Sequence, residues 1–549
     1  MTGKRISGGR TTGGRVSGGP VGPISGEAPS QAHGAPGAPA SRLPLDAPRP
    51  QPGVPTVRKP FSGGPGGPIS GEAPSQAHGA PGAPASRLPL DAPRPQPGVP
   101  PVRKPFSGTM MAPLLLGVAL NPINSTMIAT ALVAVGHAFG VGVAQTAWLV
   151  ASLYLASAVG QPTMGRLADL VGPRKVFLGG LVVVLAAGLV GALAPAFGWL
   201  IASRVLLGVG TSAAYPSAMA MLRAESRRVG VEAPRPVLGR LSLASLASAA
   251  VGPVLGGALA ATLGWRAVFA VNIPAALIGL ALAWRWAPAD PPRAADRGRV
   301  DLDPPGLLLF AATIATTMLF LMNLAHPDWL LLVLVALLGS ALVAWELRAD
   351  RPFLDLRLLG RSPGLTRTFV RSGLTYLVLY CMLYGFSQWL QESHGLSSFH
   401  AGLIALPMSV TAAVFSLLGA RTKTLRVPLV VLTLLLGAGS ALLLVLDAHT
   451  PIAVLVLAST LFGVGQGLAS SCNQAAVYAQ APADGTGSAA GLQRTSIYLG
   501  AILSSSVLAL LYGSRATDVG LHGIALVMSL LCAALLLFTA ADRALRAGR

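Results

Sequence analysis

Residues 165–175 concentrate charge and glycine between two long apolar segments. They read Gly-Arg-Leu-Ala-Asp-Leu-Val-Gly-Pro-Arg-Lys, and the positions suited to chemistry are Gly165, Arg166, Asp169, Gly172, Arg174 and Lys175. The carboxylate can pair with the three cations, while the glycines allow a sharp turn and close backbone approach. We therefore predict an ion-pair latch at one membrane face, and we call residues 165–175 the gating loop. The plainer alternative is a short basic link between any two membrane helices.

Arg204 is a second candidate because it lies inside an apolar segment. It opens the run Arg-Val-Leu-Leu-Gly-Val-Gly. A guanidinium within a membrane is costly, so by default it indicates a functional site. The alternative is that Arg204 reaches one membrane face or pairs with backbone carbonyl groups.

A proline–glycine cluster follows in the next apolar segment, at Gly252, Pro253, Gly256 and Gly257. Proline removes a helix hydrogen bond, and the glycines permit a kink and intimate helix contact. A structural kink alone would need no such cluster, yet the cluster by itself does not identify a cargo.

Polar side chains within the apolar segments could contact a substrate. The candidates are Asn124, Tyr154, Gln161, Tyr376, Tyr380, Tyr384, Gln388 and Gln493. Three of the tyrosines recur every four residues, which predicts one stripe along a helix that Gln388 continues. Ordinary helix packing is the alternative interpretation of this stripe.

Composition excludes several classes of protein. The chain has 549 residues, of which 52% are hydrophobic and only 11% are charged, too few charges to cover a soluble protein. The net charge of +20 lies in short links and in a tail, so we expect a lipid bilayer and no nucleic acid as partner. The sequence has no phosphate-binding Gly-Lys-Ser or Gly-Lys-Thr loop, nucleophile elbow or Cys/His cluster. We therefore predict no enzyme, no cofactor and no metal.

The first 108 residues differ from the rest. Residues 17–61 recur almost unchanged at 62–106, and the repeat consists mainly of Pro, Gly, Ala and Ser. Such a chain cannot bury enough apolar surface to offset its ordering entropy. We expect residues 1–108 to form a disordered tail.

A membrane span needs roughly 20 apolar helical residues, and fourteen segments beyond the tail meet this requirement. They lie at about 110–134, 143–164, 176–196, 198–221, 238–263, 267–286, 306–325, 329–347, 369–390, 400–419, 427–446, 452–473, 489–512 and 520–541. The predicted layout is a six-helix bundle at 109–286, a linker at 287–304, an inserted pair at 305–348, a linker at 349–368 and a second six-helix bundle with a short tail at 369–549.

Cations and an internal echo support this layout. Arg and Lys gather in alternate links, one of which ends at Arg371, whereas the other links hold only Arg266 and Arg515. Cytoplasmic links are enriched in Lys and Arg, so both termini should face the cytoplasm. Leu-Leu-Gly-Val-Gly at 206–210 returns as Leu-Phe-Gly-Val-Gly at 461–465, which indicates two related halves. Coincidence among glycine-rich helices is the alternative.

These motifs carry a family resemblance. The gating loop resembles the signature loop between the second and third helices of the major facilitator superfamily, a large group of secondary transporters. The run from Arg204 is similar to that superfamily's fourth-helix motif, whose arginine is implicated in proton coupling. Gly-Pro-Val-Leu-Gly-Gly at 252–257 resembles its exporter motif. Six helices, a pair and six more are similar to the fourteen-helix drug:proton antiporters, over about residues 110–545.

The resemblance implies a fold and a function. The fold would be an all-α integral membrane protein in which two six-helix bundles rock about a central site. The function would be export of amphipathic small molecules such as drugs across the plasma membrane by proton antiport, carried out by a monomer. The gating loop would latch the inner side shut in the outward-facing state.

One departure from the family leaves alternatives open. The first helix of the family often carries a carboxylate, but the matching stretch here reads Ile-Asn-Ser-Thr at 123–126, and no acidic residue lies near the middle of a predicted span. Arg204 then favours neutral or anionic cargo. The alternatives are an exporter of an endogenous neutral or anionic metabolite that protons do not drive, and a non-transporting receptor or scaffold.

Overall fold

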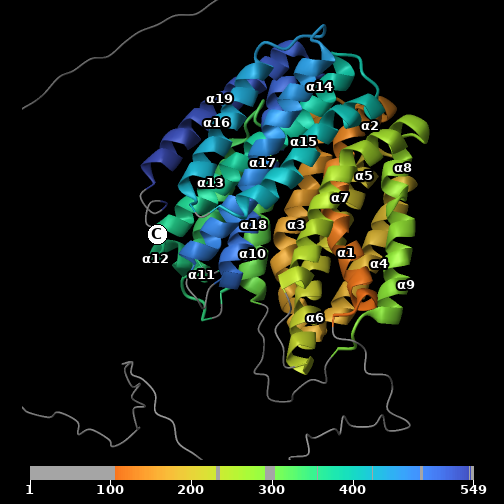
Figure 1. Ribbon diagram of the computed structural model, residues 1–549, viewed down its shortest axis with the longest axis vertical. Helices are drawn as coiled ribbons and strands as arrows, with labels where there is room; N and C mark the ends of the chain where they lie inside the picture. Colours follow the sequence, from red (N-terminus) through yellow and green to blue (C-terminus); the bar gives the residue numbers. More distant parts are fainter. Residues whose placement is uncertain are drawn as a thin grey trace, which may run out of the picture. The chain divides into compact units, whose positions relative to one another are not determined.

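The computed structural model describes residues 106–229, 235–290, 303–350, 352–354, 356–422, 424–481, 486–542 and 545. Nearly all of the repeated tail lies outside these ranges. Within them, every regular element is a helix (Figure 1). The predicted all-helical fold is therefore confirmed.

The helices fall into two halves and an inserted pair. The N-terminal half contains α1 (Gly108–Met127), η1 (Ile128–Thr130), α2 (Leu132–Phe139), α3 (Val143–Val171), α4 (Pro173–Ala192), α5 (Phe197–Ser212), α6 (Ala214–Val229), α7 (Arg235–Thr262), α8 (Trp265–Ala270) and α9 (Asn272–Trp286). The inserted pair is α10 (Pro304–Met322) and α11 (Trp329–Glu346). After the short α12 (Leu356–Arg361), the C-terminal half contains α13 (Pro363–Tyr380), the π-helical turn η2 (Cys381–Phe386), α14 (Ser387–Glu392), α15 (Ser398–Gly419), α16 (Arg426–Leu443), α17 (Ile452–Gln480), α18 (Thr486–Tyr512) and α19 (Asp518–Ala541).

Among the described residues, fourteen helical spans are long and apolar enough to cross a membrane, in agreement with the predicted number. Some spans join consecutive elements: α1 with η1, α5 with α6, α8 with α9, and α13 with η2 and α14. The inserted pair forms two separate spans. The chain is therefore a multi-pass membrane protein.

Because each span crosses the bundle once, alternate turns lie at the same end. We call the end that holds the turn between α3 and α4 the basic end, and the opposite end the far end. By this alternation, the turn between α15 and α16 lies at the basic end. The turns between α2 and α3 and between α18 and α19 lie at the far end.

The two halves meet closely at the far end. The Ala144 N–H at the start of α3 donates to the Gly513 carbonyl oxygen after α18 at 2.8 Å. Figure 1 shows α3 beside α18, and the two helices pack against each other. On another side of the bundle α7 packs against α15, where a Cβ at Gly402 would lie 2.5 Å from the Pro253 carbonyl oxygen. Two helix crossings therefore join the halves.

The echoed glycines occupy equivalent places in the two halves. In α5, the backbone at Gly208 faces α3 and that at Gly210 faces α4. In α17, Gly463 faces α15 and Gly465 faces α16. In each run, the first glycine therefore contacts the helix two spans earlier in the chain, and the second glycine contacts the helix one span earlier. This correspondence supports two related halves.

The proline–glycine cluster places α7 against two helices at once. A Cβ at Gly252 or Gly256 would meet the end of α1, whereas one at Gly257 would meet the Ser398 carbonyl oxygen at the start of α15. The carbonyl group of Pro253 accepts a hydrogen bond from Thr130 at 3.3 Å. The cluster is therefore a crossing at which α7 contacts helices of both halves.

We predict that Gly256→Val destabilises the protein by about 1–3 kcal/mol, because α7 and α1 must separate to accommodate the side chain. A Cβ there would lie 2.8 Å from the Thr130 hydroxyl oxygen and nearer still to the Met127 carbonyl oxygen. Thermal unfolding of purified protein measures the effect. The matched control is Gly179→Val in α4, where nothing lies within 4 Å of the added atom. Equal losses in both variants would contradict the packing argument.

Candidate transport path and gating loop

The gating loop forms the turn between α3 and α4. Gly172 makes this turn with a φ of 112°, a region that other residues rarely adopt. Pro173 then begins α4. The Asp290 carboxylate, which follows α9, accepts the N–H of Arg174 at 2.7 Å and caps the positive end of α4. Asp290 was not among the predicted residues, because nothing in its local sequence connects it with a turn far earlier in the chain.

A pocket of about 950 Å³ opens beside this turn. Behind the turn, Gly165 lies on α3, and a Cβ built there would lie 3.7 Å from Pro216 of α6. Lys175 is exposed. The charged residues that line the pocket are Asp169, Arg174, Lys175, Arg223, Arg227 and Asp290.

The predicted latch is not assembled in this conformation. The Arg174 guanidinium donates to the Trp284 carbonyl oxygen at 2.6 Å, and that of Arg166 donates to the Phe353 carbonyl oxygen at 3.3 Å. Asp169 is exposed and has no hydrogen bond or ion pair with another described residue. The structure therefore gathers these charges at one turn, and the latch remains a prediction.

Arg204 lies between the helices of the N-terminal half and is 2% exposed. Its guanidinium donates to the carbonyl oxygens of Leu149 at 2.9 Å and Asn124 at 3.3 Å. These bonds match the alternative in which the arginine pairs with backbone. However, its Nη2 atom is buried without a partner among the described residues. A buried donor without an acceptor is energetically costly.

Tyrosines from both halves meet at the centre of the bundle. Tyr380 stacks on Tyr384 with ring centroids 5.9 Å apart and an interplanar angle of 14°. Tyr376 lies 5.9 Å from Tyr380, so the three residues form the predicted stripe. Tyr154 of α3 contributes from the other half, with its ring 5.1 Å from that of Tyr380 and 5.6 Å from that of Tyr498 in α18.

Hydrogen bonds between the two halves close the tyrosine cluster at Tyr154 and Tyr384. The hydroxyl groups of Tyr154 and Tyr384 are 3.0 Å apart, and Tyr384 donates to the Ser125 carbonyl oxygen at 2.7 Å. Tyr154 and Tyr384 are fully buried, whereas Tyr376 and Tyr380 are half-buried. Tyr376 and Tyr380 are therefore the more accessible part of the stripe.

The predicted amide residues differ in the hydrogen bonds that their side chains form. Asn124 exchanges two hydrogen bonds with Asn272 at 2.7 and 2.9 Å. Gln388 donates to the Tyr384 carbonyl oxygen at 3.0 Å, within the π-helical turn. The Asn124 amide thus joins two spans, whereas the Gln388 amide bonds within its own span. Of the other two, Gln161 donates to the Tyr498 hydroxyl group, and Gln493 on α18 is 9% exposed.

Arg494 is a further residue of this centre that the predictions omitted. It is accessible to solvent, yet its guanidinium interacts electrostatically with the four tyrosines Tyr215, Tyr376, Tyr380 and Tyr498. It lies inside the span that runs from Ala489 to Tyr512, so it carries the same sequence signal that identified Arg204. The centre therefore combines an aromatic wall with a guanidinium that solvent can reach.

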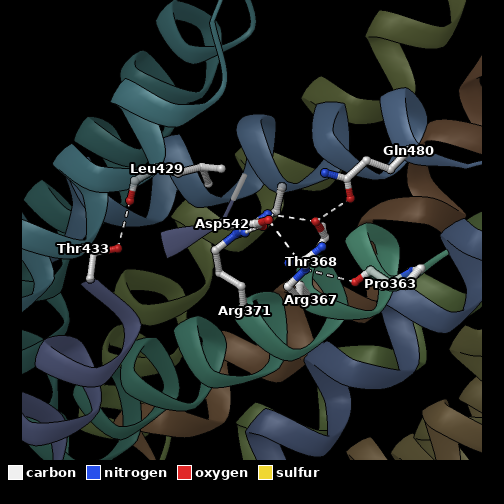
Figure 2. A network of polar contacts seen from close by, with 9 residues as sticks. Pro363, Arg367, Thr368, Arg371, Leu429, Thr433, Gln480 and Asp542 are labelled. Carbon is white, nitrogen blue, oxygen red and sulfur yellow. Dashed lines mark hydrogen bonds and ion pairs between the residues drawn. The ribbon is translucent and has the colours of Figure 1, made fainter. Parts of the chain in front are cut away.

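A second polar network joins the basic ends of α13, α17 and α19 (Figure 2). Arg371, grouped above with a basic link, instead lies within α13 and is 1% exposed, which corrects that assignment. Its guanidinium pairs with Asp542 at 3.3 Å and donates to Asn473 at 3.3 Å and Thr368 at 2.8 Å. Thr368 donates in turn to Gln480 at 2.8 Å. The network ties three helices of the C-terminal half together.

Two helical halves that meet around a polar centre are typical of secondary transporters. A family model described as "Major Facilitator Superfamily" matches residues 114–505 and 368–547. The chain belongs to the Major Facilitator Superfamily, as the gating loop and the helix motifs predicted.

Several curated proteins are similar along most of their length. The uncharacterized MFS-type transporter YwoD of Bacillus subtilis is 35% identical over 408 residues, which cover 73% of this chain and 89% of that protein. The tetracenomycin C resistance and export protein of Streptomyces glaucescens is 29% identical, with 73% and 75% covered. The multidrug efflux pump LfrA of Mycolicibacterium smegmatis is 27% identical, with 73% and 80% covered.

A solved structure has the same fold. It is the crystal structure of a bacterial homolog to the human lysosomal transporter Spinster, in an inward-facing and unoccupied conformation. The TM-score is 0.60 at 16% sequence identity, and the match covers 81% of this chain and 99% of that chain. At this identity the likeness shows the fold alone.

We predict that Asp542→Asn destabilises the protein by about 3–5 kcal/mol, because it leaves the Arg371 charge buried without its counter-ion. Thermal unfolding measures the loss. Asp447→Asn, which changes an exposed carboxylate between α16 and α17, is the matched control. The double variant Arg371→Met/Asp542→Leu should recover most of the stability, and its failure to do so would contradict the ion-pair explanation.

Proposed function

We propose that the protein is a secondary active exporter of amphipathic small molecules, which exchanges its cargo for protons by alternating access. The observation that carries this proposal is the meeting of Tyr154 with Tyr380, Tyr384 and Tyr498 between the two halves. A site at that place becomes accessible from either side when the halves rock. The drug-resistance and efflux proteins among the relatives support export as the direction.

The conformation fits one step of such a cycle. Hydrogen bonds between α3 and the segment after α18 close the far end, while Asp169 at the basic end has no partner among the described residues. If the latch forms only when the basic end closes, Asp169 is expected to lack a partner while that end is open. We infer that the basic end faces the cytoplasm of a plasma-membrane protein with both termini inside, and that the protein acts as a monomer.

The charges at the centre favour one class of cargo. Arg494 faces the tyrosines, and Arg204 keeps a buried nitrogen atom without a partner. Among the described residues, no carboxylate forms a hydrogen bond or an ion pair with either arginine or with the clustered tyrosines, which are Tyr154, Tyr376, Tyr380, Tyr384 and Tyr498. A cationic drug would lose its hydration there without compensation. We therefore propose neutral or anionic aromatic cargo.

A rival function within the same class also has a structural observation in its favour. Asn124 occupies the position of the family's first-helix carboxylate and is fully engaged with Asn272. This neutral pair has no proton to exchange at physiological pH. The rival is therefore an exporter of an endogenous neutral or anionic metabolite that runs without protons.

Transport by reconstituted vesicles separates these two functions. We expect vesicles that contain the wild-type protein to accumulate tetracenomycin C against its gradient only while a pH gradient is imposed. Asp169→Ala should reduce this accumulation by about tenfold, because the basic end can no longer be latched. Asp447→Asn is the control and should transport normally. Accumulation that does not depend on the pH gradient would favour the proton-independent metabolite exporter. Unchanged transport by Asp169→Ala would exclude the latch.

We predict that Arg494→Gln raises the KM for an anionic aromatic cargo by about tenfold, because one charge-assisted contact is worth roughly 1.5–3 kcal/mol. The KM for a neutral cargo of the same shape should change much less. Competition for efflux in cells measures both values. Arg266→Gln, at an exposed arginine before α9, is the matched control. Equal effects on both cargoes would show that Arg494 does not read charge.

A further inference from the structure

Two carboxylates are buried together at the basic end of the inserted pair. Asp303 precedes α10 and is 9% exposed, and Glu346 ends α11 and is 0% exposed. A Cβ built at Gly306 would lie 2.9 Å from the Glu346 Oε1 atom and nearer still to the Asp303 Oδ2 atom. Both oxygen atoms therefore border the same small space, which only a glycine leaves open.

Backbone and indole donors satisfy all but one of the four oxygen atoms. Asp303 accepts from the Trp345 indole N–H at 2.9 Å through Oδ1 and from the Phe353 N–H at 2.9 Å through Oδ2. Glu346 accepts from the Leu354 N–H at 3.1 Å through Oε2. Its Oε1 atom is buried and has no hydrogen-bond partner among the described residues. A proton on this atom would turn it into a donor toward Asp303.

Among the described residues, the arginines beside the two carboxylates donate hydrogen bonds to backbone carbonyl groups. From α3, Arg166 interacts electrostatically with Glu346. From α12, Arg357 donates to the carbonyl oxygens of Leu347 and Ala349 instead of to the pair. The other charged residues near these elements, among those described, are the exposed Asp169, Arg348, Asp350 and Arg494. Two carboxylates side by side in a dry site cannot both ionise without counter-charge, so they tend to share a proton.

We propose that Asp303 and Glu346 form a proton-binding site, and that loss of its proton tightens the attachment of the gating loop to the inserted pair. This proposal rests on the proton exchange proposed above and names the site that sequence alone did not supply. The proton resides on the Glu346 carboxyl group and is donated to the Asp303 carboxylate. It leaves to solvent at the basic end.

Phe353 connects this site with the gating loop. Its N–H is bonded to Asp303, and its carbonyl oxygen accepts from Arg166 at 3.3 Å. The Arg166 guanidinium also lies 5.4 Å from the centre of the Phe353 ring. When the proton leaves, an added negative charge attracts Arg166 more strongly. Arg166 lies three residues before Asp169 on α3, so both project from one helix face and the proton sets how freely the loop moves.

The inserted pair is well placed to act on both halves. α10 packs against α3 of the N-terminal half and α18 of the C-terminal half. These two helices form one of the crossings that join the halves. A change of charge at the base of α10 therefore acts on a helix that contacts both halves.

Infrared titration of the purified full-length protein tests the site without cargo. We expect a carbonyl stretch from a protonated carboxyl group at neutral pH in the wild type and in Asp328→Asn, an exposed carboxylate at the other end of α11. Glu346→Gln should lose this band. Its persistence in Glu346→Gln, or its absence from the wild type, overturns the site. Should Glu346→Gln fail to fold, Asp303→Asn replaces it: the remaining carboxylate then ionises and the band is again lost, whereas a persistent band overturns the site.

Vesicle transport tests the coupling to the gating loop. With tetracenomycin C as the probe, Glu346→Gln should keep cargo-for-cargo exchange within about twofold of the wild type but lose about tenfold of the accumulation driven by a pH gradient. Equal driven accumulation in both proteins contradicts the coupling and leaves the proposed function intact. No pH-driven accumulation by the wild type contradicts the proposed antiport and with it the coupling, and the infrared band then decides the proton site by itself.

Discussion

A polar group that is left unpaired among lipid-embedded helices is costly, and this constraint shapes the bundle. Arg204 uses backbone carbonyl groups, Asn124 and Asn272 satisfy each other, and Arg371 pairs with a carboxylate that follows the last helix. Each solution fixes helices that are far apart in the sequence. The polar residues thus hold each half together, while glycines set how closely the halves approach.

Among the described residues, twelve buried side-chain atoms have no hydrogen-bond partner, and two of them lie at places for which a function is proposed above. One nitrogen atom of Arg204 and one oxygen atom of Glu346 are buried and unbonded among the described residues. The first lies near the tyrosine centre, and the second lies at the base of the inserted pair. A transporter needs a position that binds cargo and another that binds the coupling ion. These two atoms lie at the places proposed for the cargo and for the coupling ion.

Much of the fold could be predicted from the sequence, because apolar length and the positions of glycine are local signals. The two short spans of the inserted pair, the echoed glycines and the tyrosine stripe were all found in this way. Contacts between distant residues were not predictable. Nothing near Arg371 indicates Asp542, which lies 171 residues later, and nothing near Gly172 indicates Asp290. Asp303 was assigned to a linker, since only the folded chain brings it to Glu346. Arg494 carries the same sequence signal as Arg204, a cation inside an apolar span.

The π-helical turn Cys381–Phe386 interrupts the span that carries the tyrosine stripe. Such a turn holds one residue more than an α-helical turn. Within it, the Tyr384 carbonyl oxygen accepts a hydrogen bond from the Gln388 side chain. If the extra residue migrated along the helix, every side chain it passed would swing by about 100° around the helix axis. Tyr384 could then leave its contacts with the other half without any movement of the bundle as a whole. The span thus contains a mechanical joint of its own, located where the two halves touch.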